Sequence, residues 1–220
     1  MYLSLVNVTL YPEPSTYRKC KRYKQFLPTG LQLYDASLEG IGVVLHTLDT
    51  DSQRSTLVVL STQLPFDLAH DASFQNTAEF IAIVIGIVML ARRGIVGAPL
   101  GIALLGDNTS SLSWAQRERF KEGRSRRAAI IFITLCSVLD IRVEHTEHQA
   151  GVKNVICDGL SRGTTPLELG YTKNQILDIN SDHVMQELLQ LCDPTTDAVS
   201  HESIVTLCIN VRHLATLLLN

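Results

Sequence analysis

Four acidic side chains in this sequence have the type and placement to bind metal ions together. Each stands near the end of a predicted strand or helix, and they are Asp35, Glu79, Asp107 and Asp158. Carboxylates that gather at one place repel one another, and a hard divalent cation such as Mg²⁺, which prefers oxygen ligands, relieves that repulsion. Two such ions roughly 3.5–4 Å apart stabilise the attacking and the leaving oxygen when a phosphodiester is cleaved. The four carboxylates therefore predict a metal site suited to phosphodiester hydrolysis.

Each of these residues also has a structural interpretation. Asp35 could occupy a turn, and Asp107 and Asp158 could each cap a helix. Glu79 follows Asn76 by three residues, which is the spacing of a capping box with Asn76 as the N-cap. These alternatives stay open for each residue taken alone. A common site is favoured because separate caps would not require this particular order of elements.

The elements that must position the four carboxylates form an α/β pattern. Strand-like runs over residues 31–36, 41–48 and 55–64 follow one another closely and predict an antiparallel meander. An apolar helix containing "FIAIVIGIVMLA" follows, with Gly94 after its last turn, and then a short strand, "GIALLGD". A second apolar helix, "RRAAIIFITLCSVLD", a fifth strand, "IRVEHTEH", and a closing helix complete the unit. This order predicts a mixed five-stranded sheet with flanking helices over residues 31–163.

The segments on either side of this unit differ from it in character. Residues 1–30 include a basic cluster, "RKCKRYK" at 18–24, and predict an N-terminal arm or linker that either contacts nucleic acid or joins an upstream domain. Residues 164–220 contain two helix-like segments and predict a helical C-terminal extension. We expect these helices to pack against the sheet unit or against another chain.

Composition restricts the class of protein. With 45% hydrophobic and 19% charged residues, the chain of 220 residues is typical of a globular protein. Its net charge of −3 argues against binding nucleic acid by bulk positive charge. The five cysteines include no Cys-x-x-Cys pair, so we expect neither a disulfide framework nor a zinc ribbon, and we expect an intracellular, reducing location. The apolar run at 80–91 is too short to span a bilayer, which predicts a buried helix and no membrane partner.

Four segments of the chain resemble, in the same order, the motif blocks of a known family. They are "LYDASLEGIGVVL", "NTAEFIAIVIGIVMLAR", "LLGDNTSSLSW" and "HQAGVKNVICDGLSR". The family is the ribonuclease H domain found at the end of reverse transcriptases of gypsy-like LTR retroelements. The resemblance implies a ribonuclease H-like fold and an endonuclease that uses two Mg²⁺ ions, or Mn²⁺ as a substitute, to cut the RNA strand of an RNA/DNA hybrid. It also implies a polymerase domain as a partner and a cytoplasmic, nuclear or retroelement-particle location.

The resemblance also assigns roles to individual residues. It makes Asp35, Glu79, Asp107 and Asp158 the metal-binding catalytic carboxylates, and it makes His148 a group that assists proton transfer or product release. Polar groups beside two of the carboxylates, and a basic stretch at 117–127, are expected to contact the sugars and phosphates of the substrate. These expected substrate contacts are Ala36, Ser37, Asn108, Thr109, Ser110, Arg124, Arg126 and Arg127. For the basic stretch, a solvated helix face is the alternative.

Other readings of the sequence stay open beside this one. His145, His148 and Cys157 could form a partial zinc set, although they lack a convincing fourth ligand. Trp114 could stack near the substrate, but a place in the core is favoured. For the whole chain, the rival functions are a catalytically silent binding or scaffolding module of the same fold and a nuclease of the same fold that acts on DNA.

The fourth motif block departs from the family pattern at one place. The sequence has Cys157-Asp158-Gly159 where Ala-Asp-Ala is commoner in retroelements.

Overall fold

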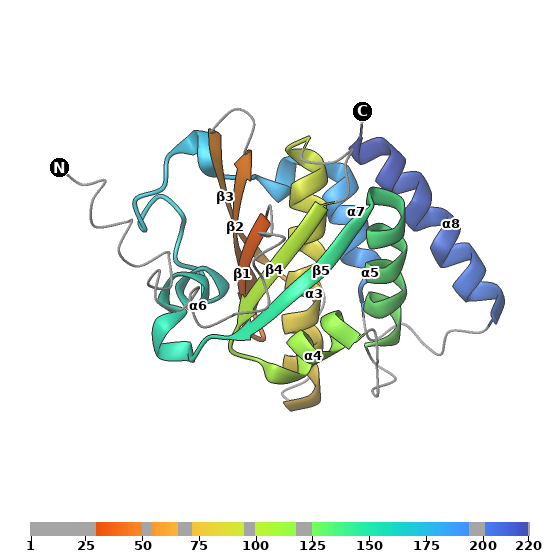
Figure 1. Cartoon of the computed structure of the whole chain (residues 1–220), viewed down its shortest axis with the longest axis horizontal. Coiled ribbons are helices and arrows are strands. Elements are labelled where there is room, and N and C mark those ends of the chain that lie inside the picture. The colour runs from red at the N-terminus through yellow and green to blue at the C-terminus, as the bar shows by residue number, and fades with distance from the viewer. Residues whose placement is uncertain are drawn as a thin grey trace.

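A single mixed sheet organises the protein (Figure 1). The computed structural model describes residues 30–49, 54–65, 72–94, 100–117, 125–193 and 201–219. Five strands lie in the order β3-β2-β1-β4-β5, in which β1 to β3 are antiparallel and β4 and β5 run parallel to β1. Their bounds are β1 (Gly30–Ala36), β2 (Gly40–Asp49), β3 (Arg54–Gln63), β4 (Leu100–Gly106) and β5 (Ile141–His148). The predicted meander and mixed five-stranded sheet are confirmed.

Helices cover the two faces of the sheet unequally. On one face lie α3 (Ala72–Arg92), α4 (Thr109–Arg117) and α5 (Arg126–Leu139), and their side chains form the larger hydrophobic core with the sheet. On the other face, the short helix α6 (Val155–Ser161) packs on β1 and β2 over a smaller core. In Figure 1, β4 and β5 cross in front of α3, and α6 lies at the opposite side of the sheet from α5. The predicted flanking helices are therefore present.

Helix α3 is the centre of the larger core. Its hydrophobic residues from Phe80 to Ala91 are at most 2% exposed, because the helix contacts β1 and β2 on one side and α5 on another. The stretch Phe74–Arg92 is long and apolar enough to cross a membrane, but nearly all of it is buried inside the protein. The predicted buried helix is confirmed. Gly94 follows it with φ 68°, a left-handed conformation that glycine adopts without strain.

The predicted start of this helix is wrong. Helix α3 begins at Ala72, so Asn76 is not an N-cap and Glu79 lies about two turns inside the helix. The helix extends further because Phe74 is buried in the core and the Gln75 side-chain amide donates to the backbone oxygen of Ala36. The Oδ1 atom of Asn76 instead accepts a hydrogen bond from Asn108 at 2.7 Å.

A buried amide joins α3 to the central strand. The Nε2 atom of Gln32 donates to the backbone oxygens of Ala82 and Ile83 at 3.1 and 3.3 Å, and the residue is fully buried. Gly86 leaves room for it, because a Cβ atom there would lie 2.0–2.3 Å from the atoms of the Gln32 amide.

We expect Gly86→Ala to lower the free energy of unfolding by about 2 kcal/mol, since the cost of overpacking and of the displaced buried amide exceeds the gain in helix propensity. Denaturant unfolding of the single and double variants measures this effect. In a Gln32→Ala background the added methyl group should cost little. An equal cost in both backgrounds would show that the amide is not what Gly86 accommodates.

The C-terminal helices share the core of the sheet unit. Helices α7 (His183–Leu191) and α8 (His201–Leu218) insert Met185, Leu188 and Leu214 into the larger core beside α3 and α5. Asp182 caps α7 by accepting from two backbone amides at 3.1 Å, and it also pairs with Arg92 of α3 at 2.6 Å. These helices thus pack against the sheet unit, which is one of the two expected arrangements.

The turns between α6 and α7 cover one edge of the sheet. They include η2 (Lys173–Gln175) and η3 (Ile179–Ser181), and the amide of Leu177 donates to the oxygen of Val59 in β3 at 2.9 Å. This contact protects an edge strand that would otherwise offer free backbone groups to another chain.

Candidate active site

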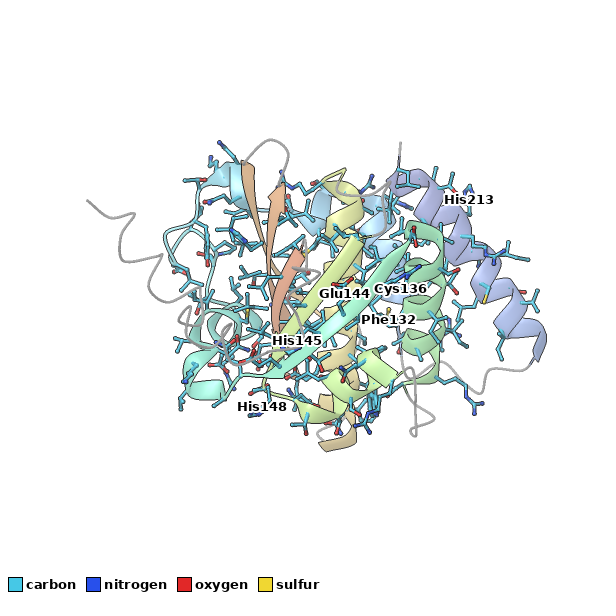
Figure 2. The ribbon with its side chains drawn as sticks, viewed as in Figure 1. Phe132, Cys136, Glu144, His145, His148 and His213 are labelled. Atoms are coloured by element: carbon cyan, nitrogen blue, oxygen red, sulfur yellow. The ribbon has the colours of Figure 1, made fainter. Side chains whose placement is uncertain are left out.

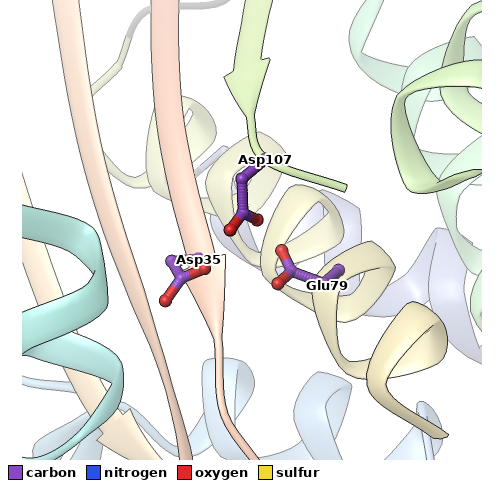
Figure 3. Close-up of side chains that lie close together, drawn as sticks. All are labelled: Asp35, Glu79 and Asp107. Carbon is purple, nitrogen blue, oxygen red and sulfur yellow. The ribbon is translucent and has the colours of Figure 1, made fainter. Parts of the chain in front are cut away.

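Three of the four predicted carboxylates meet at one end of the sheet (Figure 3). Strands β1 and β4 are parallel neighbours, and their last paired residues are Leu33 and Leu105, so Asp35 and Asp107 both follow two residues later. Glu79 reaches the same place from α3. One oxygen of each carboxylate lies within 4.8 Å of the others, and Figure 3 shows the three groups turned toward one another. The expected convergence of Asp35, Glu79 and Asp107 is therefore observed.

The site is largely closed to solvent. Asp35 is 5% exposed and Glu79 is 2% exposed, whereas Asp107 is half-buried. Gln75 donates to Glu79 Oε1 at 3.3 Å, but Glu79 Oε2 is buried without a hydrogen-bond donor among the described residues. Buried polar atoms are almost always satisfied, so an oxygen left without a donor beside two more carboxylates fits a site for a divalent cation.

The surroundings of Asp35 and Glu79 favour the protonated forms of these two carboxyl groups. Burial raises the pKa of Asp35 to about 6, with the charges of Asp107 and Asp158 adding to the rise and a hydrogen bond from Ser161 opposing it. Burial, and then the charges of Asp35 and Asp107, raise the pKa of Glu79 well above its usual value. Cation binding would therefore release protons from this cluster, as expected for ligands that must be ionised to bind.

These shifts predict an unusual pH dependence for the metal-free protein. A carboxyl whose pKa is raised in the folded state holds a proton there that the unfolded chain releases, so it makes the unfolding free energy fall as pH rises. For Asp35 the fall runs from pH about 4 to about 6. The reduction reaches up to about 3 kcal/mol by pH 7.

The measurement is the difference in unfolding free energy between Asp35→Asn and the wild type, in EDTA, across this range. The difference should be near zero at pH 4 and favour the variant at pH 7. A constant difference would contradict the assigned shift.

The fourth carboxylate stands beside the cluster. Asp158 is half-buried in α6, and its Oδ1 atom accepts from the Nε atom of Arg162 at 2.7 Å. Its charge contributes to the raised pKa of Asp35, but Asp158 is not part of the group of three. Sequence reasoning did not anticipate the pairing with Arg162.

The structural interpretations of the four acids do not hold. Asn108, not Asp107, caps α4, because its Oδ1 atom accepts from the amides of Ser110 and Ser111 at 3.0 Å. Asp158 is the fourth residue of α6 and therefore not its N-cap. Asp35 lies in β1, paired with Gly42, and is not a turn residue.

His145 and His148 lie on β5 (Figure 2). His148 is the exposed last residue of this strand and is in register with Gly106, the residue before Asp107. His145 lies 3.6 Å from Glu147. Burial raises the pKa of the Cys157 thiol well above its usual value, which disfavours the thiolate that zinc requires. Among the described residues, the group able to hold a metal contains no histidine or cysteine, so the partial zinc set is not supported.

The side chains of the two residues after Asp35 are buried or hydrogen-bonded within the protein. Ala36 is 4% exposed. The hydroxyl of Ser37 donates to the oxygen of Ser161 at 2.8 Å and accepts from two backbone amides at 3.1 Å. Beyond Asp107, the side chain of Asn108 is occupied by capping α4 and by Asn76, whereas Thr109 is exposed and Ser110 is half-buried.

The predicted phosphate contacts are only partly described. Arg126 is exposed at the start of α5, and Arg127 donates to the oxygen of Leu191 at 3.2 Å. Arg124 and the basic cluster at 18–24 lie outside the described residues. Trp114 packs in the core with its ring centroid 6.0 Å from that of Phe80, as favoured from the sequence.

Three solved structures show the kind of protein that this chain resembles. Ribonuclease H1 from the archaeon Halobacterium salinarum is 17% identical with a TM-score of 0.41, covering 61% of this chain and 96% of that one. LC11-ribonuclease H1, isolated from compost by a metagenomic approach, is 15% identical with a TM-score of 0.46, covering 65% and 99%. The same enzyme in complex with an RNA/DNA hybrid is 13% identical with a TM-score of 0.41, covering 60% of this chain and 92% of that one.

No protein-family model and no curated protein matches this chain. The order of strands and helices therefore defines the fold, and the case for a function rests on the residues of the site.

Proposed function

We propose that this protein is a metal-dependent endonuclease of the ribonuclease H type, which hydrolyses the RNA strand of RNA/DNA hybrids. The observation that carries the proposal is the meeting of Asp35 of β1, Glu79 of α3 and Asp107, directly after β4, with one oxygen of each within 4.8 Å of the others. The Oε2 atom of Glu79 is buried and accepts no hydrogen bond from the described residues, which leaves it available to bind a cation. A hard oxygen donor set of this kind suits Mg²⁺, with Mn²⁺ as a substitute.

Each of the site residues would then have a separate role in hydrolysis. Asp35, Glu79 and Asp107 hold the cation, and Asp158, at the more exposed side, would complete a second cation position once released from Arg162. Bound divalent ions supply an activated water and neutralise charge that develops on the phosphate. The exposed imidazole of His148 lies at the same end of the sheet and would assist proton transfer or product release.

The preference for RNA would come from the 2′-hydroxyl and from the shape of the hybrid groove. Exposed Thr109 and half-buried Ser110 follow Asp107 directly and are the polar side chains free to contact a sugar there. Such contacts touch sugar and phosphate, so little sequence preference is expected.

The retroelement origin is also a proposal. It is supported by the four motif blocks in order, including "CDGLSR", and it implies a reverse-transcriptase polymerase domain as partner and an intracellular location. Co-purification of the chain with a polymerase from the same element would support this association.

The experiment incubates the full chain with matched RNA/DNA hybrid, RNA duplex and DNA duplex, each labelled on either strand, in Mg²⁺, Mn²⁺ or EDTA. We expect cleavage of the RNA strand of the hybrid alone, and none in EDTA. Binding of the hybrid without cleavage in either metal would favour the silent binding module, a candidate that the Asp158–Arg162 pair supports. Cleavage of DNA duplex at a comparable rate would identify a DNA nuclease instead.

A further inference from the structure

A buried serine connects the metal site to the helix that carries the fourth carboxylate. The hydroxyl of Ser161, the last residue of α6, donates to Asp35 Oδ2 at 2.9 Å. Ser161 is 2% exposed and Asp35 is 5% exposed, so water does not compete effectively for this bond. Hydrogen bonds to a buried, charged acceptor are stronger than those between neutral groups. The bond spans 126 residues of sequence and links the side chains of α6 and β1 directly at the site.

The Ser161 hydroxyl has two acceptors and one proton. Its oxygen lies 2.9 Å from Asp35 Oδ2 and also 2.9 Å from the backbone oxygen of Asp158, the ordinary acceptor for a serine in a helix. An ionised carboxylate is the better acceptor. When Asp35 is ionised, as a cation ligand must be, the proton therefore goes to Asp35.

The backbone around Ser161 is held firmly in place. Ser37 donates to the backbone oxygen of Ser161, and Ser61 donates to that of Leu160, both at 2.8 Å. These hydroxyls satisfy carbonyls that a helix leaves free at its C-terminus. Gly40 and Gly42 let the helix end approach the sheet, because a Cβ atom at either would lie within 3.0 Å of Ser161 backbone atoms. Because its backbone is held in place, the side chain of Ser161 keeps its position beside Asp35.

We infer that Ser161 is a positioning residue for cation binding, which keeps the Asp35 carboxylate turned toward Glu79 and Asp107. With Oδ2 held by the hydroxyl, the carboxylate cannot rotate without breaking a buried bond. Ligands held in place before binding lose less freedom when the ion arrives, so the bond favours affinity. This inference rests on the proposed function, since it takes the carboxylates as cation ligands.

The test compares two serines at the same helix end. Ser161→Ala removes the bond to the carboxylate, whereas Ser61→Ala removes a bond to a helix carbonyl. Calorimetric titration of the full chain with Mn²⁺, and the rise in melting temperature that Mn²⁺ causes, give the affinity without reference to cleavage. We expect Ser161→Ala to weaken Mn²⁺ binding about tenfold, and Ser61→Ala to change it less than about twofold.

Two more variants keep the test decisive. Ser161→Thr retains a hydroxyl and should recover most of the lost affinity. If Ser161→Ala folds poorly, Ser161→Cys replaces it in the test: cysteine is similar in size to serine but a weak donor, so it should bind Mn²⁺ as weakly as is expected of the alanine variant. Wild-type affinity in Ser161→Ala, or an equal loss in Ser61→Ala, would overturn the inference. If the wild type binds Mn²⁺ but leaves the hybrid intact, the nuclease proposal fails, and the Mn²⁺ affinities of the serine variants alone decide the positioning role. If the wild type binds no Mn²⁺, both are overturned.

Discussion

Replacing Glu79 by glutamine should abolish cleavage of the hybrid and, at the same time, raise the melting temperature of the metal-free protein. The two effects have one physical cause. Glu79 is almost fully buried beside two other carboxylates, so its ionised form is unfavourable unless a cation is bound. Glutamine keeps the shape and an oxygen that can accept from Gln75, but it carries no charge.

The loss of activity should be large. A bound ion contributes several kcal/mol of charge stabilisation in the transition state, and each 1.36 kcal/mol is a factor of ten in rate. We therefore expect Glu79→Gln to cut hybrid cleavage at saturating Mg²⁺ by at least about a hundredfold. Single-turnover cleavage assays measure the rate, and thermal unfolding in EDTA at pH 7.5 measures the stability.

A matched control distinguishes the loss of a carboxylate at the proposed metal site from the loss of a negative charge elsewhere in the protein. Glu187→Gln makes the same substitution on the exposed side of α7, where we expect no change in cleavage and less than about 0.5 kcal/mol in stability. If Glu79→Gln lowered the metal-free melting temperature, the carboxylate would be a stabilising structural group, and the argument for a cation site would lose its electrostatic basis.

The second large effect is expected at Gly42, in the strand that supports Asp35. Gly42 is paired with Asp35 across β1 and β2, and a Cβ atom on it would lie 2.5 Å from both the Cys157 backbone oxygen and the Leu160 Cβ. Helix α6 rests directly on this position. Because the Cys157 oxygen belongs to the backbone of α6, it cannot move aside as a flexible side chain could. A methyl group at Gly42 can therefore be accommodated only if α6 moves away from the sheet.

We expect Gly42→Ala to lower the free energy of unfolding by about 3 kcal/mol, at the upper end of what overpacking costs. Activity should fall as well, even in the fraction that remains folded, because the same shift moves Ser161 and Asp158 away from Asp35. Denaturant unfolding and cleavage by the folded fraction at low temperature measure the two effects.

Gly159→Ala is the control, since it adds a methyl group to α6 itself where the nearest atom, Thr164 Oγ1, is 3.4 Å away. That variant should be neutral or more stable, because alanine favours a helix over glycine. If Gly42→Ala kept wild-type stability and activity, α6 could not be as closely seated on β2 as the distances indicate.

Much of the architecture could be predicted from the sequence because its signals are local. Alternating and apolar runs identified all five strands, and the uninterrupted apolar stretch identified the buried helix α3. Errors arose where a distant contact overrode a local signal. Asn76 has the spacing of an N-cap, but burial of Phe74 and the bond from Gln75 to Ala36 extend the helix past it.

The sequence by itself determined which carboxylates were candidates and which elements would carry them, because residue type and periodicity are properties of the chain. Only the tertiary structure decided that three of them meet within 4.8 Å while Asp158 pairs with Arg162. It also decided that Glu79 keeps an oxygen without a donor and that Ser161 reaches Asp35. Distances and desolvation depend on how closely separate elements pack, and no local pattern of residues contains that information.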